Sequence, residues 1–462
     1  MKEIWSERTL ALVAAGVFVL GLGLDLATGD VDAPRPTTEI SEELFETRAS
    51  FCPPPFSSRT GTTTLALAGD PGAPTIVGIE PTASQNRELA ADRTSLYNVS
   101  GPALEVVGYG RRLHAAALLS TEKPVVGAGA ARCPRVVSDD WYFPEGSTKL
   151  GYDERLLIRN PFADEAVVSV RLYTSTGAIT RANLNRIAVP AGESRFIKLN
   201  DYVTPRTQIG AAVIAERGRV VAWRALFADP EDRPDGVQFD LGATAPAETW
   251  YLPEGAVQTG IEEEISLLNP NGREAILSIS LPTAGKPVQP PKLVEVRVPP
   301  ESLKTISLPA VSQRGRTDVG GVGAIVTSTN GVGVVAERTV WYGAARTGTS
   351  SEIGSPKTGT NWMVLPAAAS SADDSVVVLN PNPDPATISV TILTRDRGAS
   401  KPGALRSVRV KGNARIRLVL NDYTDGQPVA IVVTSDIGVV AERVSSSGNG
   451  DVSTLMGNVF TP

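Results

Sequence analysis

Apolar and polar residues alternate along most of this chain, in short segments bounded by Gly, Pro, Asn and Asp. Alternation with a period of two is typical of β-strands that bury one face. Residues 155–158 and 167–172 show this pattern, and no helical period interrupts the strands after residue 50. The pattern therefore predicts an all-β protein built from many short strands and tight turns.

The same order of predicted strands recurs along the chain, and one spaced pattern marks each copy. The pattern consists of Asn-Pro, four variable positions, Ala, two further positions, and then Ser followed by Val or Ile. Its copies are Asn160-Pro161 with Ala166, Ser169 and Val170; Asn269-Pro270 with Ala275, Ser278 and Ile279; and Asn380-Pro381 with Ala386, Ser389 and Val390. Copies this far apart indicate repeated domains rather than solenoid units.

The repeats predict four β-modules, at residues 51–138, 139–248, 249–360 and 361–462. Each later module contains about seven strands in roughly 110 residues, which is typical of an immunoglobulin-like β-sandwich. The first module is a divergent copy that lacks the Asn-Pro turn. A β-propeller is the alternative fold, although its blades usually have a period of about 40 to 50 residues.

The N-terminal segment predicts a membrane anchor. Lys2 and Arg8 precede an uncharged stretch at 9–24, and acidic residues follow it from Asp25 onward. This polarity places the N-terminus in the cytoplasm. We therefore expect a cytoplasmic tip at 1–8, a transmembrane signal-anchor helix at 9–26 and a polar spacer at 27–50. A cleaved signal peptide is the alternative; in both cases the bulk of the chain is extracytoplasmic.

Two cysteines, Cys52 and Cys133, lie near the two ends of the first module. Outside the cytoplasm such a pair is typically a disulfide. We expect it to join the first strand of the module to its last strand. No CxxC motif accompanies the pair, so a zinc site is not indicated.

Composition and charge exclude several classes of function. The net charge of -6 argues against a nucleic-acid partner, which requires a basic surface. The single histidine, His114, lies in an apolar strand and is the only candidate base for a Ser-His-Asp or Cys-His site. No phosphate-binding or dinucleotide-binding motif is present. We expect no catalytic residue, no cofactor and no resident metal, although the acidic loop at 229–235 has a composition compatible with calcium.

Other recurring residues are candidates for binding or for contacts between modules. The second and third modules open with Trp-Tyr-Phe/Leu-Pro-Glu-Gly, and an Arg ends the hairpin of apolar strands in each later module. These candidates are Trp141, Glu145, Arg224, Trp250, Glu254, Arg338 and Arg443. Because they recur with the scaffold, structural roles are favoured: the Trp residues close the module ends, and each Arg meets a Pro-Glu-Gly glutamate or carbonyls at a junction.

The opening motif and the Val-Val-Ala-Glu-Arg hairpin ends at 334–338 and 439–443 resemble modules of exported actinobacterial proteins. So does the junction Gly-Ala-Thr-Ala-Pro-Ala-Glu-Thr-Trp at 242–250. The layout after residue 50 is similar to an uncharacterised, membrane-anchored or secreted actinobacterial family, classed as a domain of unknown function. The resemblance implies no activity, substrate or catalytic residue. The fourth module lacks the Glu of the opening motif.

Taken together, the patterns predict a non-catalytic, membrane-anchored component of the cell envelope. We expect it to act as a scaffold or to bind an envelope protein through module edges and loops. The alternative is a protein that binds or cleaves cell-wall polysaccharide, because paired carboxylates and exposed aromatic rings serve such functions. A hydrolase would need acids in one module that its sister modules lack, and no such cluster is evident.

Overall fold

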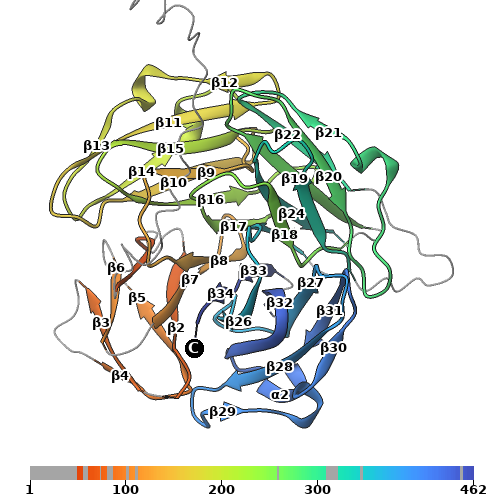
Figure 1. Ribbon diagram of the computed structural model, residues 1–462. Helices are drawn as coiled ribbons and strands as arrows, with labels where there is room; N and C mark the ends of the chain where they lie inside the picture. Colours follow the sequence, from red (N-terminus) through yellow and green to blue (C-terminus); the bar gives the residue numbers. More distant parts are fainter. Residues whose placement is uncertain are drawn as a thin grey trace, which may run out of the picture. The chain divides into compact units, whose positions relative to one another are not determined.

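The computed structural model describes residues 49–461, apart from 56–60, 73, 81–86, 100–103, 110–112, 257–259, 309–320, 344–346 and 448–450. These residues form antiparallel β-sheets within one compact unit (Figure 1), and the all-β prediction is confirmed. No helix among them is long and apolar enough to cross a membrane. The predicted tip (1–8) and anchor (9–26) lie outside the described residues, as does the spacer (27–50) until strand β1 begins at Ala49.

The first module contributes two four-stranded sheets. One has the order β1-β6-β3-β4 and the other β5-β2-β7-β8. Their bounds are β1 (Ala49–Cys52), β2 (Thr62–Gly69), β3 (Thr75–Glu80), β4 (Arg87–Leu89), β5 (Thr94–Val99), β6 (Leu104–Tyr109), β7 (Leu113–Thr121) and β8 (Gly127–Cys133).

The second module also forms two sheets, in the orders β14-β10-β16-β17 and β12-β11-β15-β9, and β13 pairs with β11. Two short 3-10 helices, η2 and η3, follow β12 and β14. The bounds are β9 (Asp140–Phe143), β10 (Tyr152–Arg159), β11 (Ala166–Thr174), β12 (Gly177–Ile179), η2 (Ala182–Leu184), β13 (Ile187–Val189), β14 (Ser194–Lys198), η3 (Leu199–Asp201), β15 (Gly210–Arg217), β16 (Val221–Ala228) and β17 (Gly236–Leu241).

The third module repeats this plan with sheets in the orders β22-β19-β24-β25 and β18-β23-β20-β21. Its β20 has the sequence AILSIS and alternates fully buried with partly buried positions, as the period of two predicts. The bounds are β18 (Thr249–Leu252), β19 (Ile261–Asn269), β20 (Ala275–Ser280), η4 (Pro291–Leu293), β21 (Val296–Val298), β22 (Ser302–Ser307), β23 (Ala324–Ser328), β24 (Val335–Tyr342) and β25 (Thr349–Ile353).

The fourth module differs because one long strand, β32, replaces the hairpin of two strands. β32 pairs with β26 and β28 along its first part and with β27 and β33 along its second, so the two sheets merge. The bounds are β26 (Gly359–Val364), β27 (Asp373–Asn380), β28 (Ala386–Leu393), β29 (Ala399–Ser400), η5 (Gly403–Leu405), β30 (Val408–Val410), β31 (Ala414–Val419), α2 (Asn421–Thr424), β32 (Ala430–Ser446), β33 (Val452–Met456) and β34 (Asn458–Val459).

The repeated Asn of the Asn-Pro pattern fixes a turn in the same way in each copy. In the second module, the Asn160 side chain is fully buried and its Nδ2 donates to the carbonyl oxygens of Asp164 at 2.7 Å and Val189 at 3.0 Å. Asn269 and Asn380 make the corresponding bonds. The amide thus satisfies carbonyls that the turn would otherwise bury without a donor, which explains why Asn recurs here.

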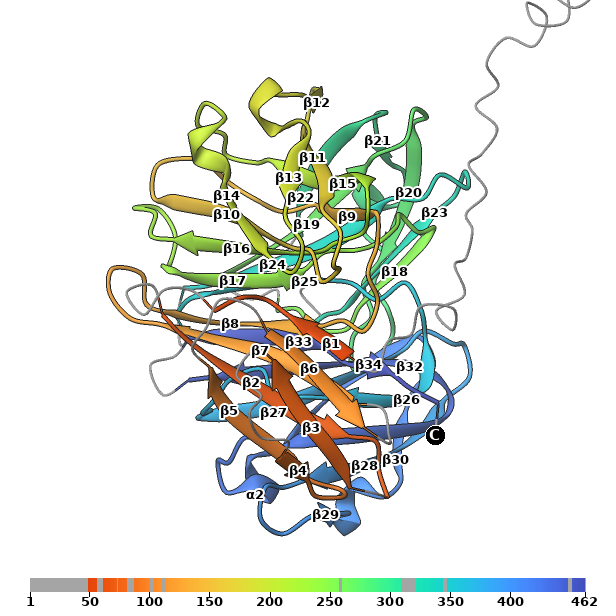
Figure 2. The same cartoon turned by 90° about the vertical axis from the view of Figure 1, so that its left-hand side faces the viewer.

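The four modules follow one another around a ring. One edge strand of each module lies beside an edge strand of the next: β8 beside β17, β17 beside β25, β25 beside β33, and β33 beside β8 (Figures 1 and 2). Gly127 of β8 permits a close backbone approach, because a Cβ there would lie 2.7 Å from the backbone nitrogen of Val237. The sequence analysis did not predict that the last module would return to the first.

The contact that closes the ring is apolar. Small and aliphatic side chains of β2, β7 and β8 pack against β26, β28, β32, β33 and the C-terminal residues. The buried cluster comprises Ala66, Ala68, Ala116, Leu118, Ala130, Met363, Leu365, Ala367, Leu393, Ala430, Val432, Leu455 and Phe460. His114 lies at its border, edge-on to Phe460 with ring centroids 5.7 Å apart, and pairs with Asp70. The histidine is thus part of the packing.

Candidate functional site

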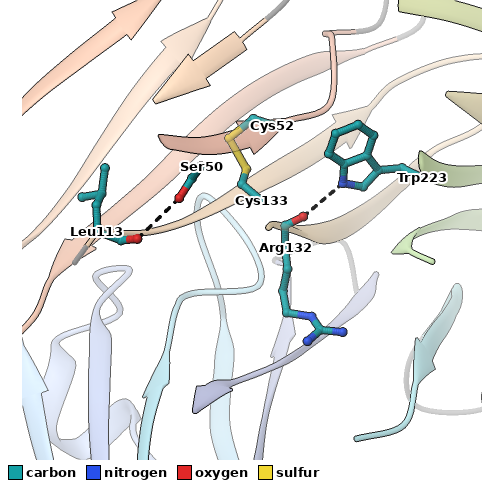
Figure 3. Close-up of a disulfide and its surroundings, with 6 residues drawn as sticks. All are labelled: Ser50, Cys52, Leu113, Arg132, Cys133 and Trp223. Carbon is teal, nitrogen blue, oxygen red and sulfur yellow. Dashed lines mark hydrogen bonds between the residues drawn. A yellow bond between two sulfur atoms is a disulfide. The ribbon is translucent and has the colours of Figure 1, made fainter. Parts of the chain in front are cut away.

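The two cysteines form the predicted disulfide. Cys52 at the end of β1 is bonded to Cys133 at the end of β8, with Cα atoms 4.5 Å apart (Figure 3). Next to this bond, the carbonyl oxygen of Arg132 accepts a hydrogen bond of 3.0 Å from Trp223 Nε1 of the second module. The disulfide therefore anchors the strand by which the first module contacts the second.

The tryptophans that open the modules are buried. Trp141 and Trp250 have exposed fractions of 0% and 2%. Their indole N–H groups donate across the module to the carbonyl oxygens of Val220 at 2.8 Å and Val334 at 2.6 Å. A ring held in this way packs the core and offers no face for stacking on a sugar, so the predicted role in closing the module is the one that the geometry supports.

The arginines that end the hairpins are fully buried, and two of them, Arg224 and Arg338, cross the junctions between modules. Arg224 Nη2 lies 2.5 Å from Glu337 Oε1 of the third module. Arg338 Nη2 lies 2.7 Å from Glu442 Oε1 of the fourth module. All four side chains have no exposed surface. Each glutamate immediately precedes the arginine of its own module, so the charges connect the second, third and fourth modules head to tail.

The expectation that each arginine pairs with a Pro-Glu-Gly glutamate needs correction. The carboxylate partners are Glu337 and Asp240 for Arg224, Glu442 for Arg338, and Asp374 for Arg443. The expected contact with junction carbonyls is present for Arg338, whose Nη1 donates to the carbonyl oxygen of Glu254. The acid of the opening motif therefore contributes its backbone to the arginine.

The Pro-Glu-Gly loops reinforce the same junctions. The backbone N–H of Glu145 donates to Glu337 Oε2 at 3.0 Å, and that of Glu254 donates to Glu442 Oε2 at 2.9 Å. The following glycine is required because a Cβ on Gly255 would lie 2.3 Å from the carbonyl oxygen of Val322. Each loop thus binds the glutamate that also receives the arginine.

The side chains of the two loop glutamates lie in different environments. Glu145 Oε2 accepts a hydrogen bond of 2.6 Å from Ser266, and burial raises the pKa of Glu145 to about 7. Burial also acts to raise the pKa of Glu254, but Arg417, Arg415 and Arg338 outweigh it and hold this pKa below its usual range. The same motif therefore carries a proton-binding acid in one module and an ionised acid in the next.

Arg443 departs from the head-to-tail pattern. Its Nε donates to Oδ1 of Asp374 at 2.6 Å, and its Nη2 donates to Oδ2 of the same residue. Asp374 belongs to the same module as Arg443. The recurring arginine thus forms ion pairs of two kinds, one between modules and one within a module.

Several buried acids of these junctions escaped the sequence analysis. Burial raises the pKa values of Glu154, Glu263 and Glu352 to about 8. Burial likewise raises the pKa of Glu337, in spite of the adjacent Arg224. An acid stands six residues before each repeated Asn, and this spacing could have identified Glu154 and Glu263. Because these strands are buried on both faces, the alternation of apolar and polar residues does not reveal that the acids are buried.

These acids do not assemble a metal site. Within the described residues, no group of three or more His, Cys, Asp or Glu side chains is placed to hold a metal ion. In the loop that had a composition compatible with calcium, Asp232 pairs with Lys149 at 3.2 Å.

One surface feature distinguishes the second module from its sisters. Asn271 and Asn382, two residues after the repeated Asn, donate from Nδ2 to the carbonyl oxygens of Gly333 and Gly438. The equivalent residue of the second module is Phe162, which is 41% exposed. A shallow groove of about 720 Å³ lies there, lined by Asn160, Phe162, Asp164, Glu165, Arg217, Gly218 and Arg219.

Comparison with known proteins gives a family match without an assigned activity. A family model described as "Family of unknown function (DUF5719)" matches residues 110–336, just under half of the chain. The match begins near β7 of the first module and ends within β24 of the third. It agrees with the predicted resemblance to an uncharacterised family; the actinobacterial origin stays a prediction. No curated protein matches the chain.

A likeness to solved structures is weak. A structure titled "Crystal Structure of Thermotoga maritima 1070" is 19% identical and covers 22% of this chain and 96% of its own, with a TM-score of 0.18. Such a score supports no argument about the arrangement of the modules.

Proposed function

We propose that this chain is a non-catalytic, membrane-anchored component of the cell envelope that acts as an extracytoplasmic scaffold or protein-interaction platform. The observation that carries the proposal is the burial of the recurring charges. The contacts between modules are formed by side chains that have no exposed surface: Arg224, Arg338, Glu337 and Glu442. Side chains so placed fix the modules relative to one another and leave edges and loops for partners.

Two further expectations belong to this proposal. The paired sheets of the later modules are interpreted as immunoglobulin-like sandwiches. The disulfide between Cys52 and Cys133 supports an oxidising, extracytoplasmic location, since such bonds persist outside the cytoplasm. The anchor at 9–26 would hold the ring of modules at the membrane surface, with the N-terminus in the cytoplasm.

The test is chemical crosslinking in native envelopes, with the full chain carrying a C-terminal affinity tag. Mass spectrometry and glycan analysis of the captured material are the readouts, and the tagged segment 1–50 is the control for capture by the anchor alone. We expect one envelope protein to be enriched reproducibly over the control. Recovery of polysaccharide without protein would contradict the proposal.

Binding of cell-wall polysaccharide is the second candidate, and the groove at Phe162 is the observation that favours it. An exposed ring beside Asp164 and the ion pair of Glu165 with Arg217, 2.7 Å apart, offers a stacking surface and polar groups for sugar hydroxyls. The buried Trp141 and Trp250 offer neither.

The second candidate has a direct test. Phe162→Asn restores the residue found in the third and fourth modules, so the fold should tolerate it. Loss of binding to purified wall polysaccharide in this variant, with binding retained in Phe196→Asn on a different exposed aromatic, would support the groove. Equal binding by wild type and Phe162→Asn would exclude it.

A further inference from the structure

Each of the last three modules carries a buried acid and a buried arginine at equivalent places. The acid stands six residues before the repeated Asn, on the first strand of its sheet. The arginine, on the neighbouring strand, lies opposite the residue two positions after the acid. Residues two apart on a strand share a face, so the acid and the arginine are diagonal neighbours. The pairs are Glu154 with Arg224, Glu263 with Arg338, and Asp374 with Arg443.

The fourth module shows this diagonal pair bonded. Arg443 Nε donates to Asp374 Oδ1 at 2.6 Å, and Ser445 Oγ donates to the same oxygen at 3.0 Å. Both charged side chains are almost completely buried. An arginine in this position can therefore use its charge entirely within its own module.

In the third module, Glu263 and Arg338 occupy the equivalent positions, but the hydrogen bond seen between Asp374 and Arg443 is not formed. Arg338 Nε and Glu263 Oε1 are both buried and have no hydrogen-bond partner among the residues that the structure describes, whereas the corresponding atoms of the fourth module are bonded. Arg338 instead reaches Glu442 of the fourth module at 2.7 Å. Glu263 Oε2 accepts a hydrogen bond of 2.9 Å from the backbone N–H of Ala256. One guanidinium thus lies between two carboxyl groups that compete for it.

We propose that Arg338 is a two-position coupler. It binds Glu442 of the fourth module while Glu263 is protonated, and ionisation of Glu263 draws it back into the third module. The contact between the third and fourth modules consequently loosens as the pH rises, and the pair Arg443–Asp374 is the structural precedent for the second position.

The surroundings of Glu263 support this order of events. It faces Arg338 on β24, Glu254 in the loop after β18, and Arg415 on β31 of the fourth module. Burial raises the pKa of Glu263 to about 8, and Glu254 acts in the same direction, while the two arginines oppose them. Glu263 therefore holds a proton at neutral pH and releases it under mildly alkaline conditions.

Glu442, the competing partner, is held by two donors. It accepts hydrogen bonds from Arg338 on β24 and from the backbone N–H of Glu254. Glu352 on β25 is an acid near Glu442, and the two carboxyl groups repel each other when both are ionised. When Arg338 leaves, the hydrogen bond from Glu254 loses the ion that aligns its acceptor. The amide of Glu254 is thus a local reporter of the junction.

The junction between the second and third modules is expected to respond less. Arg224 is bound by Asp240 of its own module at 2.8 Å in addition to Glu337 at 2.5 Å. Ionisation of Glu154 would add a third acid to an arginine that already has two. The amide of Glu145, which donates to Glu337, is therefore an internal comparison.

The experiment is hydrogen–deuterium exchange of the full chain at pH 6 and pH 9, corrected for the intrinsic rate at each pH. The proposal predicts that protection at the amide of Glu254 falls by about tenfold or more at pH 9, since one pKa unit corresponds to a factor of ten. In Glu263→Gln, which mimics the protonated acid, protection should stay at its pH 6 value.

Matched controls keep the result specific. Glu274→Gln alters an exposed acid of the same module, paired with Arg297 at 2.8 Å, and should behave as wild type. Unchanged protection of Glu254 in the wild type between the two pH values would overturn the proposal. So would an undiminished loss in Glu263→Gln, or a loss confined to Glu145. Should Glu263→Gln fail to fold, the wild-type comparison of Glu254 with Glu145 still decides.

Discussion

Arg338 of the third module and Glu442 of the fourth form an ion pair of 2.7 Å in which neither side chain has any exposed surface. Transfer of two charges out of water is costly, so such a pair contributes less to stability than its distance suggests. The pair instead acts on the relative position of the two modules, because moving one partner away would leave the other as a buried charge without compensation. The pair therefore fixes the two modules relative to each other for as long as Arg338 stays bound to Glu442.

Removal of the cation should strongly destabilise the protein. We expect Arg338→Met to lower the free energy of unfolding by about 3–5 kcal/mol, because Glu442 would remain buried without a counter-ion. Chemical denaturation of the full chain measures this. Arg297→Met, at an arginine that is about half exposed, is the control and should change stability little. Equal stability of Arg338→Met and wild type would show that the buried pair does not hold the junction.

Stability should decline as the pH rises from about 4.5 to about 8. Burial raises the pKa of Glu154 to about 8 from a usual value of 4.5, so the folded state binds a proton that the unfolded state releases. This contribution is complete below about pH 4.5 and is lost as the pH rises through about 8. Glu154→Gln should flatten the decline and exceed wild type in stability at pH 9. Thermal melts at pH 5, 7 and 9 are the measurement, and a variant curve parallel to wild type would contradict the prediction; Glu165→Gln, at an exposed acid, serves as the control.

Loss of the disulfide should destabilise the first module. Cys52 and Cys133 are separated by 81 residues in sequence, and removal of a native disulfide typically costs about 2–5 kcal/mol. The double variant Cys52→Ser/Cys133→Ser should therefore unfold at a lower denaturant concentration than the oxidised wild type. Wild type treated with reductant should match the variant, and a difference between the two would indicate that the serines themselves disturb β1 or β8.

The apolar closure of the ring should not tolerate a charge. Ala116 is fully buried between the first and fourth modules, so Ala116→Asp places a carboxylate against apolar side chains such as Leu455 and Phe460. We expect a loss of about 3 kcal/mol or an opened ring, since burial of an unpaired charge is unfavourable. Limited proteolysis and size-exclusion chromatography report the opening. Ala399→Asp on the exposed strand β29 is the control, and the same digestion pattern in both variants would argue against the closure.

Because the modules repeat, much of the fold could be predicted from the sequence. The spacing from Asn160 to Ala166 and Ser169 predicted a turn into a strand, and the structure has that turn and strand β11. The hairpin of the fourth module was expected as two strands, but β32 is continuous from Ala430 to Ser446. A local pattern of apolar residues does not distinguish two strands joined by a turn from one strand that changes its partners, because the partners are distant in sequence.

The candidate site was predicted only in part. Recurrence identified Arg224, Arg338 and Arg443 as junction residues, and their local sequences are so alike that one role was expected for all three. The structure assigns Arg338 to the next module and Arg443 to its own. That distinction depends on which module follows in space, and the sequence of a single repeat contains no information on it.

The sequence by itself determined the β-class, the repeat, the turns and the disulfide pair, because each rests on local spacing, on the chemistry of Asn and Pro, or on the presence of only two cysteines. Tertiary structure alone decided that the last module returns to the first, that Trp141 and Trp250 are buried, and which carboxylate each arginine binds. These outcomes depend on packing between residues that are far apart in the sequence. A charge removed from water is costly unless a partner lies beside it, so the position of the partner matters more than its residue type.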